Sequence, residues 1–136
     1  MRYLIDKNLL THEIMKNETR RYDLCIIEDV IDEAGMNADQ IKSINQRGIQ
    51  CLKVSKHHLE KLKIIMTSYG SNLKLINLCH GKGSADVVML AYILSEQEIA
   101  GTLFINDFTI LTKDKELINV ATQLGIKTIG LLGLEN

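Results

Sequence analysis

Short apolar runs alternate with longer segments of helical periodicity along this chain of 136 residues, and this alternation is the feature that most constrains its fold. Apolar runs of this length, bounded by polar or turn residues, are typical of buried strands. We expect strands at residues 2–5, 24–27, 49–54, 102–105, 109–111 and 127–129. We expect helices, caps included, at residues 8–16, 29–35, 37–48, 55–66, 84–94 and 115–125. The alternation predicts an α/β fold, a three-layer sandwich with a mainly parallel central sheet. Because no linker, internal repeat or low-complexity segment interrupts it, we expect a single domain over residues 1–136.

Small polar residues and glycines mark the expected helix ends, since the chain contains no proline. Asp29 is predicted to cap the helix over residues 30–34, and Gly35 to end it. Ser55 is predicted to cap the helix that runs to residue 66. Helical spacing places four apolar side chains on one face of that helix, which we expect to be buried: Leu59, Leu62, Ile65 and Met66.

Two histidines and a glycine-rich stretch are weaker candidates for a site. His57 and His58 lie in sequence beside Glu60 and Lys61, so we expect a solvated helix surface there rather than a metal site. Residues 81–84 contain a Gly-Lys-Gly-Ser sequence, but the spacing of a phosphate-binding loop is absent.

The composition is that of a folded protein with no overall positive charge. Hydrophobic residues make up 46% of the chain and charged residues 24%, which excludes an intrinsically disordered chain. The formal net charge of −1 creates no global field for binding nucleic acid. It counts little against an enzyme whose bound metal ions bring local positive charge to a phosphate group. No apolar run approaches the roughly 20 residues of a membrane span. Cys25, Cys51 and Cys79 form no CxxC pair, so we expect core residues of a cytoplasmic protein.

Four acidic residues follow expected strands or lie on expected helices. Asp6 follows the first strand, Asp114 follows the strand at residues 109–111, and Glu33 and Asp86 lie on helices. In a parallel sheet, ligands bind beyond the carboxyl ends of the strands, and we expect the four carboxylates to gather there. Carboxylate oxygens are the ligands that a hard divalent cation such as Mg²⁺ takes. The pattern therefore predicts a divalent-metal site.

Each of these residues also has a purely structural interpretation. Asp6 fits a turn, Asp86 fits a first-turn carboxylate stabilised by the helix dipole, and Asp114 fits an N-cap. Glu28 and Asp29 lie nearer to the end of the second strand than Glu33 does, and either can take the place of Glu33 at a site.

Four sequence elements together resemble the PIN-domain family of nucleases. Asp6-Lys7-Asn8 is similar to the opening aspartate of the family, which is followed by a small hydroxyl residue and then Asn; Lys7 departs from that pattern, and a hydroxyl hydrogen bond is lost. The other elements are the glutamate in residues 30–34, the aspartate that starts the Ala- and Leu-rich helix of residues 83–91, and the strand, Thr and Asp of residues 110–117. The tail at residues 124–134 fits a subset of PIN-like proteins.

The resemblance implies a metal-dependent endoribonuclease. Asp6 and Asp86 would be inner ligands of Mg²⁺ or Mn²⁺, with Asp114 and Glu33 as further ligands or groups that position water. Two more residues would orient the carboxylates by hydrogen bonds: Asn8 and Thr112. The family includes the toxins of toxin–antitoxin pairs, so the resemblance also implies an RNA substrate, a homodimer and a partner antitoxin. DNA presents the same phosphodiester, and the sequence does not distinguish the two substrates.

Two other functions compete with a nuclease. The first is a non-catalytic PIN-like module that binds a partner, which the Lys7 departure and the low positive charge favour. The second is a response-regulator-like domain with a carboxylate pocket for Mg²⁺. That class requires adjacent acidic residues after the first strand, whereas the first strand here is followed by a single one, Asp6.

Overall fold

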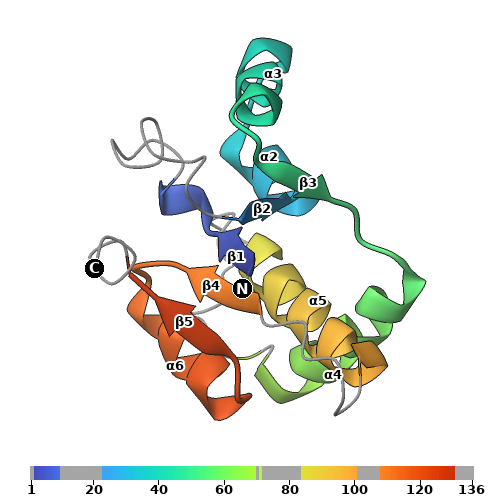
Figure 1. Ribbon diagram of the computed structural model, residues 1–136. Helices are drawn as coiled ribbons and strands as arrows, with labels where there is room; N and C mark the ends of the chain where they lie inside the picture. Colours follow the sequence, from blue (N-terminus) through green and yellow to red (C-terminus); the bar gives the residue numbers. More distant parts are fainter. Residues whose placement is uncertain (1, 10–22, 70, 72–83, 101–107, 131–136) are drawn as a thin grey trace.

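Five parallel strands form one sheet in the computed structural model, which describes residues 2–9, 23–69, 71, 84–100 and 108–130 (Figure 1). The strand order is β3-β2-β1-β4-β5. The strands are β1 (Arg2–Ile5), β2 (Leu24–Ile27), β3 (Gln50–Leu52), β4 (Phe108–Leu111) and β5 (Lys127–Ile129). The helices are the short 3-10 helix η1 (Lys7–Leu9), α2 (Glu28–Ala34), α3 (Ala38–Gln46), α4 (Lys56–Tyr69), α5 (Ser84–Ala100) and α6 (Lys115–Gln123).

The central strands are apolar because both of their faces are covered. Every residue of β2 and of β4 is buried, as expected for strands in the middle of a parallel sheet. β1 lies between these two strands and pairs Leu4 with Cys25 on one side and with Ile110 on the other. This register brings the ends of β1 and β4 to the same edge of the sheet, where the site described below is located.

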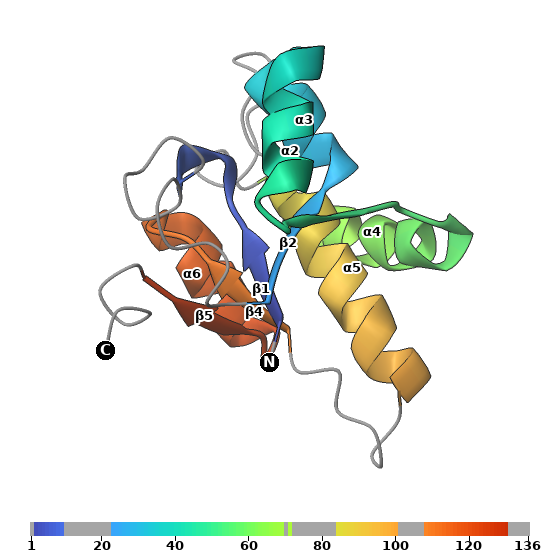
Figure 2. The ribbon, with the colours of Figure 1, turned by 45° about the horizontal axis from the view of Figure 1, so that its top comes forward.

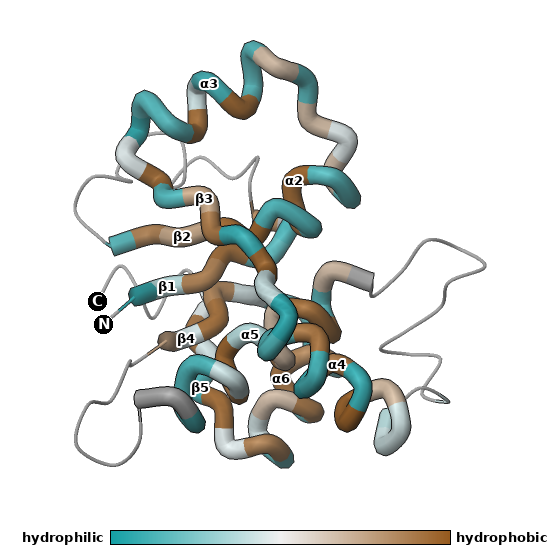
Figure 3. Tube along the Cα trace, turned by 90° about the vertical axis from the view of Figure 1, so that its right-hand side faces the viewer, coloured by the Kyte–Doolittle hydropathy of each residue, from teal (hydrophilic) through white to brown (hydrophobic). Residues whose placement is uncertain are grey.

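Helices α4, α5 and α6 lie on one face of the sheet (Figures 1 and 3). The connections from β3 to β4 and from β4 to β5 run in the same direction across the sheet, and right-handed crossovers therefore place their helices on the same face. Helix α5 lies between the sheet and α4 (Figure 2). This position explains why residues 85–93 of α5 are buried without interruption, since the sheet contacts one side of the helix and α4 the other.

The structure confirms the α/β fold and the parallel sheet predicted from the sequence. β1, β2 and β5 have the expected bounds, whereas β3 is shorter than the expected residues 49–54 and α5 extends past the expected residue 94. The strand expected at residues 102–105 lies outside the described residues, as does the helix expected at residues 8–16 apart from its beginning in η1. The three-layer arrangement therefore stays a prediction.

The predicted capping role of Asp29 is wrong. Helix α2 begins at Glu28, directly after β2, and its N-cap is Ile27 in an extended conformation with no side-chain cap. Because the strand runs into the helix without a turn, Asp29 lies in the first helical turn. Gly35 does end the helix, at φ 65°, in the left-handed region that glycine adopts at little cost.

The predicted buried face of α4 is also partly wrong. Leu59 is 52% exposed, whereas His58, expected on a solvated surface, is only 4% exposed. Ser55 precedes the helix as expected, but its backbone N–H donates to Nδ1 of His58 at 2.9 Å. The buried face of the helix contains His58 and Ile65.

No helix among the described residues is both long and apolar enough to cross a membrane.

Candidate metal centre

The order of the strands changes direction between β1 and β4. From β1 the chain proceeds outward to β2 and β3, while from β4 it proceeds to β5 on the opposite side. At such a reversal of direction the connections leaving the two central strands diverge, and ligands of open α/β sheets bind there. Asp6 directly follows β1, and Thr112 directly follows β4.

A chain of hydrogen bonds joins Asp6, Thr112 and Asp114. The hydroxyl of Thr112 donates to Oδ2 of Asp6 at 2.7 Å, and the backbone N–H of Asp114 donates to the same hydroxyl at 3.0 Å. Asp6 and Thr112 are both buried, 3% and 1% exposed. Thr112 therefore orients the Asp6 carboxylate, which is the role expected of it from the sequence.

Asp114 is the N-cap of α6. Its Oδ1 accepts hydrogen bonds from the backbone N–H groups of Glu116 at 3.0 Å and Leu117 at 3.2 Å. These bonds satisfy two of the N–H groups that the first turn of a helix leaves without a partner. Because the cap engages Oδ1, it does not use Oδ2. Asp114 therefore caps α6 with Oδ1, and its other carboxylate oxygen, Oδ2, is a candidate ligand for a metal ion at the site.

Glu33 connects α2 to η1 and to the start of α5. Its Oε2 accepts from the backbone N–H of Ala85 at 2.8 Å, and its Oε1 accepts from Nζ of Lys7 at 3.1 Å. The side chain of Glu33 is 15% exposed, and that of Lys7 is 37% exposed. The sequence did not predict this pairing, because Lys7 and Glu33 are 26 positions apart.

Asp86 lies in the first turn of α5, and the pKa of its carboxyl group is strongly raised. The pKa of Asp86 is raised to about 7, first by burial and then by the negative charges of Asp6, Asp114 and Glu33. The ammonium of Lys7 opposes this shift. Perturbation by burial and by several like charges is typical of functional carboxylates.

The pKa of Asp6 is also raised, first by burial. The hydrogen bond from Thr112 lowers the pKa of this carboxyl, while the charges of Asp114 and Glu33 raise it. The four carboxylates expected from the sequence therefore act on one another electrostatically, and we call Asp6, Glu33, Asp86 and Asp114 the acidic cluster.

The two alternatives to Glu33 belong to a different group. The pKa of Asp29 is raised by burial and by the charges of Glu28 and Asp32. Neither Glu28 nor Asp29 is among the charges that shift the pKa of Asp6 or Asp86, whereas Glu33 shifts both. Of the three candidates, the structure therefore brings Glu33 to the acidic cluster. The side chain of Asn8, the remaining expected residue, lies outside the described residues.

The donor set of the acidic cluster fits Mg²⁺ or Mn²⁺, because all of its side-chain ligands are carboxylate oxygens. The four carboxylates lie within electrostatic reach of one another but do not converge on one point. Among the described residues, the potential metal ligands that lie within 4.8 Å of one another are those of another group, His57, His58 and Glu96. Glu33 is bonded to Lys7, and Asp114 to the first turn of α6.

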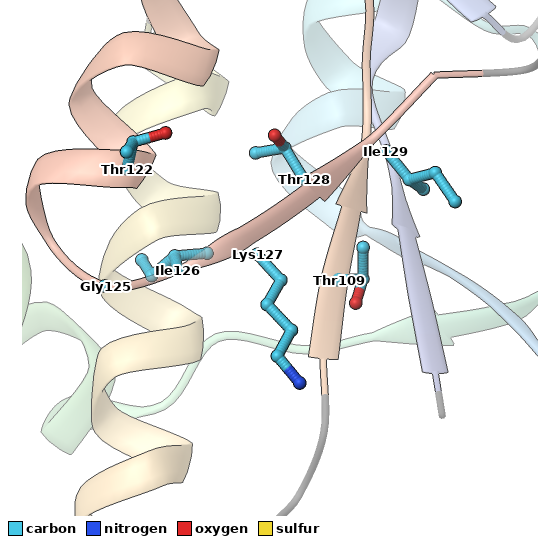
Figure 4. Close-up of a pocket in the computed structure, with 7 residues that line it drawn as sticks. All are labelled: Thr109, Thr122, Gly125, Ile126, Lys127, Thr128 and Ile129. Carbon is cyan, nitrogen blue, oxygen red and sulfur yellow. The ribbon is translucent and has the colours of Figure 1, made fainter. Parts of the chain in front are cut away.

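An open groove of about 520 Å³ lies beside β5 (Figure 4). It is lined by Thr109, Thr122, Gly125, Ile126, Lys127, Thr128 and Ile129. The buried Oγ1 of Thr109 has no hydrogen-bond partner among the described residues. None of the four carboxylates lines this groove, so it is separate from the acidic cluster.

Comparisons with known proteins do not assign the chain. No protein-family model matches it, and a search of curated proteins finds no significant match.

Proposed function

We propose that this protein is a Mg²⁺- or Mn²⁺-dependent phosphodiesterase, an endoribonuclease of PIN-like type that uses Asp6, Glu33, Asp86 and Asp114. The observation that supports it best is the group of carboxylates beyond the carboxyl ends of β1 and β4, where burial first and then the neighbouring negative charges raise the pKa values of Asp6 and Asp86. Buried carboxylates that lack enough internal positive charge are expected to bind a cation.

The residues of the cluster have different roles in this proposal. Asp6 and Asp86 hold the cation, and Thr112 keeps the Asp6 carboxylate in one orientation through its 2.7 Å hydrogen bond. Asp114 and Glu33 act as further ligands or position the attacking water. The bound cation supplies a water of lowered pKa and polarises the scissile phosphate.

The carboxylates must be ionised to hold the cation. In the metal-free protein, the pKa of Asp86 near 7 keeps much of this carboxyl protonated at neutral pH. Cation binding therefore displaces a proton from Asp86, and the affinity for Mg²⁺ is expected to rise as the pH increases through 7.

The test is cleavage of a mixed RNA pool by the purified protein with Mg²⁺, with Mn²⁺ and with EDTA. The Asp86→Asn variant, purified in parallel, controls for contaminating nucleases. Metal-dependent cleavage that is lost in the variant supports the proposal. Equal cleavage by the native protein and by both Asp86→Asn and Asp6→Asn would contradict the proposed site. A single-stranded DNA of matched sequence, tested beside the RNA, determines which phosphodiester is cut.

One observation favours a non-catalytic interaction module as the second candidate. Lys7 forms an ion pair with Glu33 and thus provides an internal cation at the position where the PIN family has a small hydroxyl residue. For this candidate we expect a folded protein that neither cleaves RNA nor binds Mg²⁺ by isothermal titration calorimetry.

The toxin form of the proposal adds a homodimer and a partner antitoxin. Light scattering of the purified chain tests the dimer. An antitoxin would be expected to abolish the RNA cleavage when bound, and this requires that the cleavage itself be established first.

A further inference from the structure

His57, His58 and Glu96 form a second polar group, which we call the histidine cluster, at the contact between α4 and α5. One ligand atom from each side chain lies within 4.8 Å of the other two. His58 is buried and Glu96 is partly buried, whereas His57 is exposed. Two imidazoles and a carboxylate from two helices are thus gathered at one place, which is the donor set of many Zn²⁺ sites.

Hydrogen bonds and ring contacts fix the position of His58. Its Nε2 donates to Oε1 of Glu96 at 2.8 Å, while its Nδ1 accepts from the backbone N–H of Ser55 at 2.9 Å. The ring also stacks on Tyr92 of α5 at a centroid distance of 4.2 Å. Tyr92 and Glu96 are one helical turn apart and present the same face of α5 to the histidine. The ring is therefore preorganised, which a metal ligand requires.

Ser55 allows the ring of His58 to adopt either neutral tautomer. The Ser55 backbone N–H is a donor 2.9 Å from Nδ1, and the Ser55 hydroxyl is an acceptor 3.0 Å from the same nitrogen. Without metal, the proton is on Nε2 and is donated to Glu96. When a cation binds Nε2, the proton would move to Nδ1, where the Ser55 hydroxyl can accept it, and the backbone N–H of Ser55 would give up its hydrogen bond to Nδ1. Metal-bound histidines commonly donate their other N–H to such an oxygen.

We propose that the histidine cluster binds Zn²⁺, or a chemically similar ion such as Co²⁺, through Nε2 of His58, a carboxylate oxygen of Glu96 and a ring nitrogen of His57. Water completes a tetrahedral shell. The side chain of His57 is exposed, so rotation of its ring brings its nitrogen to ligand distance without disturbing the core. An ion at this position connects the beginning of α4 to the second half of α5.

The histidine cluster is chemically distinct from the acidic cluster. Its imidazole nitrogens favour Zn²⁺ over Mg²⁺, which prefers oxygen ligands and keeps several waters. None of its members is among the charges that shift the pKa of Asp6 or Asp86. The Zn²⁺ proposal therefore does not depend on the proposed nuclease activity.

The experiment is a titration of the metal-stripped full-length protein with Zn²⁺, Co²⁺ and Mg²⁺, followed by calorimetry and by the thermal midpoint. All titrations are repeated in the Asp86→Asn variant, so that Zn²⁺ bound by the acidic cluster is not counted. The visible absorption of bound Co²⁺ reports whether the coordination is tetrahedral. We expect one Zn²⁺ or Co²⁺ per chain, tetrahedral bands for Co²⁺ and no competition from Mg²⁺.

Substitutions identify the ligands. His57→Ala and Glu96→Gln are each expected to weaken Zn²⁺ binding about tenfold or more. Glu98→Gln is the matched control, because Glu98 forms an ion pair with Lys61 across the same two helices but lies outside the cluster, and it is expected to bind Zn²⁺ normally. Undiminished Zn²⁺ binding by His57→Ala, or no binding at millimolar Zn²⁺ by the native protein, would overturn the proposal. The cluster would then be a hydrogen-bonded connection between helices alone.

Discussion

The acidic cluster and the histidine cluster both bury polar side chains, but only the histidine cluster balances them internally. His58 has a hydrogen-bond acceptor in Glu96 and a donor in Ser55. In the acidic cluster, the ammonium of Lys7 is the one cation that the described residues place beside the four carboxylates. Burial alone therefore does not show whether a polar group depends on an ion: the hydrogen bonds of His58 are satisfied without one, although we propose that its cluster binds Zn²⁺. The excess of one charge sign is more informative, because the fold must tolerate a repulsion that an external cation would relieve.

The largest effect should come from removing one carboxylate of the acidic cluster. Asp86→Asn is expected to reduce metal-dependent RNA cleavage by about 10³-fold or more, because a cation ligand and a charge of the reacting site are lost together. The measurement is the single-turnover rate at saturating Mg²⁺. Asp32→Asn is the control, since Asp32 is an exposed acidic residue of α2, next to Glu33. An equally large loss of activity in Asp32→Asn would show that RNA cleavage depends on the net negative charge of the protein and not on the acidic cluster.

The stability of the metal-free protein should depend on pH through the protonation of Asp86. The pKa of Asp86 is about 7 in the folded protein, against 3.8 for an ordinary Asp, so the folded state holds a proton that the unfolded chain releases. The contribution of Asp86 to the free energy of unfolding is therefore most favourable below about pH 4, falls between pH 4 and 7, and stays at its lowest above pH 7. The total loss is at most about 4 kcal/mol.

Urea unfolding in EDTA across this pH range measures the effect. Asp86→Asn should flatten the pH profile and stabilise the protein at pH 8, and saturating Mg²⁺ should also raise the stability of the native protein there. A native profile with no fall between pH 4 and 7 would show that the carboxylates are balanced internally, as in the histidine cluster.

The histidine cluster should show the opposite behaviour when one partner is removed. His58→Leu leaves Glu96 and the backbone N–H of Ser55 without their hydrogen bonds, and we expect a loss of about 1–3 kcal/mol in the free energy of unfolding. Leu59→Lys, on the adjacent exposed residue, is the control and should change stability by less than about 0.5 kcal/mol. If His58→Leu were stabilising, the histidine would be a buried group under strain, and the contrast between the clusters would disappear.

Replacing Thr112 tests whether one hydroxyl positions both the carboxylate of Asp6 and the backbone of Asp114. Thr112→Val keeps the shape but removes the donor to Asp6 and the acceptor for the Asp114 N–H, and it should cost about 1–2 kcal/mol. It should also raise the pKa of Asp6, because the Thr112 hydrogen bond lowers that pKa. Thr112→Ser retains the hydroxyl, so its free energy of unfolding and its Asp6 pKa should both stay close to those of the native protein. Equal effects of Val and Ser would mean that the methyl group, not the hydroxyl, is important.

The smallest effect is expected for Lys7→Met. Lys7 is partly exposed, so loss of its ion pair with Glu33 should cost no more than about 0.5–1 kcal/mol of stability without metal. Removing this ammonium should increase the affinity for Mg²⁺ several-fold, since a competing positive charge is lost. Calorimetry measures this change, with the exposed Lys56→Met as control. A decrease in Mg²⁺ affinity would indicate that Lys7 assists the site instead of competing with the cation.

The strands and several helix ends were predictable because their signals are local. The fully apolar run Leu24–Ile27 became β2 with the same bounds, and Gly35 ended α2. The positions of Asp6 after β1 and of Asp114 beyond β4 were predictable from the sequence. In a parallel sheet all strands end at the same edge, so residues that follow a strand lie at that edge whatever the strand order is.

The rest depended on contacts between distant segments. Strand order cannot be read from apolar runs, and the pairing of Lys7 with Glu33 joins residues 26 positions apart. The inward position of His58 follows from Glu96, which is 38 positions away. In the sequence, the polar residues around His58 had indicated a solvated face of α4. The N-cap of α2 was missed because β2 continues directly into the helix, with no turn for Asp29 to occupy.

The hydrogen bonds divide the acidic cluster into two mechanical halves. Asp6, Thr112 and Asp114 move together with β1, β4 and α6, because the Thr112 hydroxyl joins all three. Glu33 moves with the start of α5, because it is bonded to the Ala85 N–H one residue before Asp86. Any displacement of the α2–α5 pair relative to the sheet therefore changes the separation between the halves and leaves each half intact. The separation of the two halves thus depends on how α2 and α5 pack against the sheet and on the ion pair between Lys7 and Glu33, which joins them.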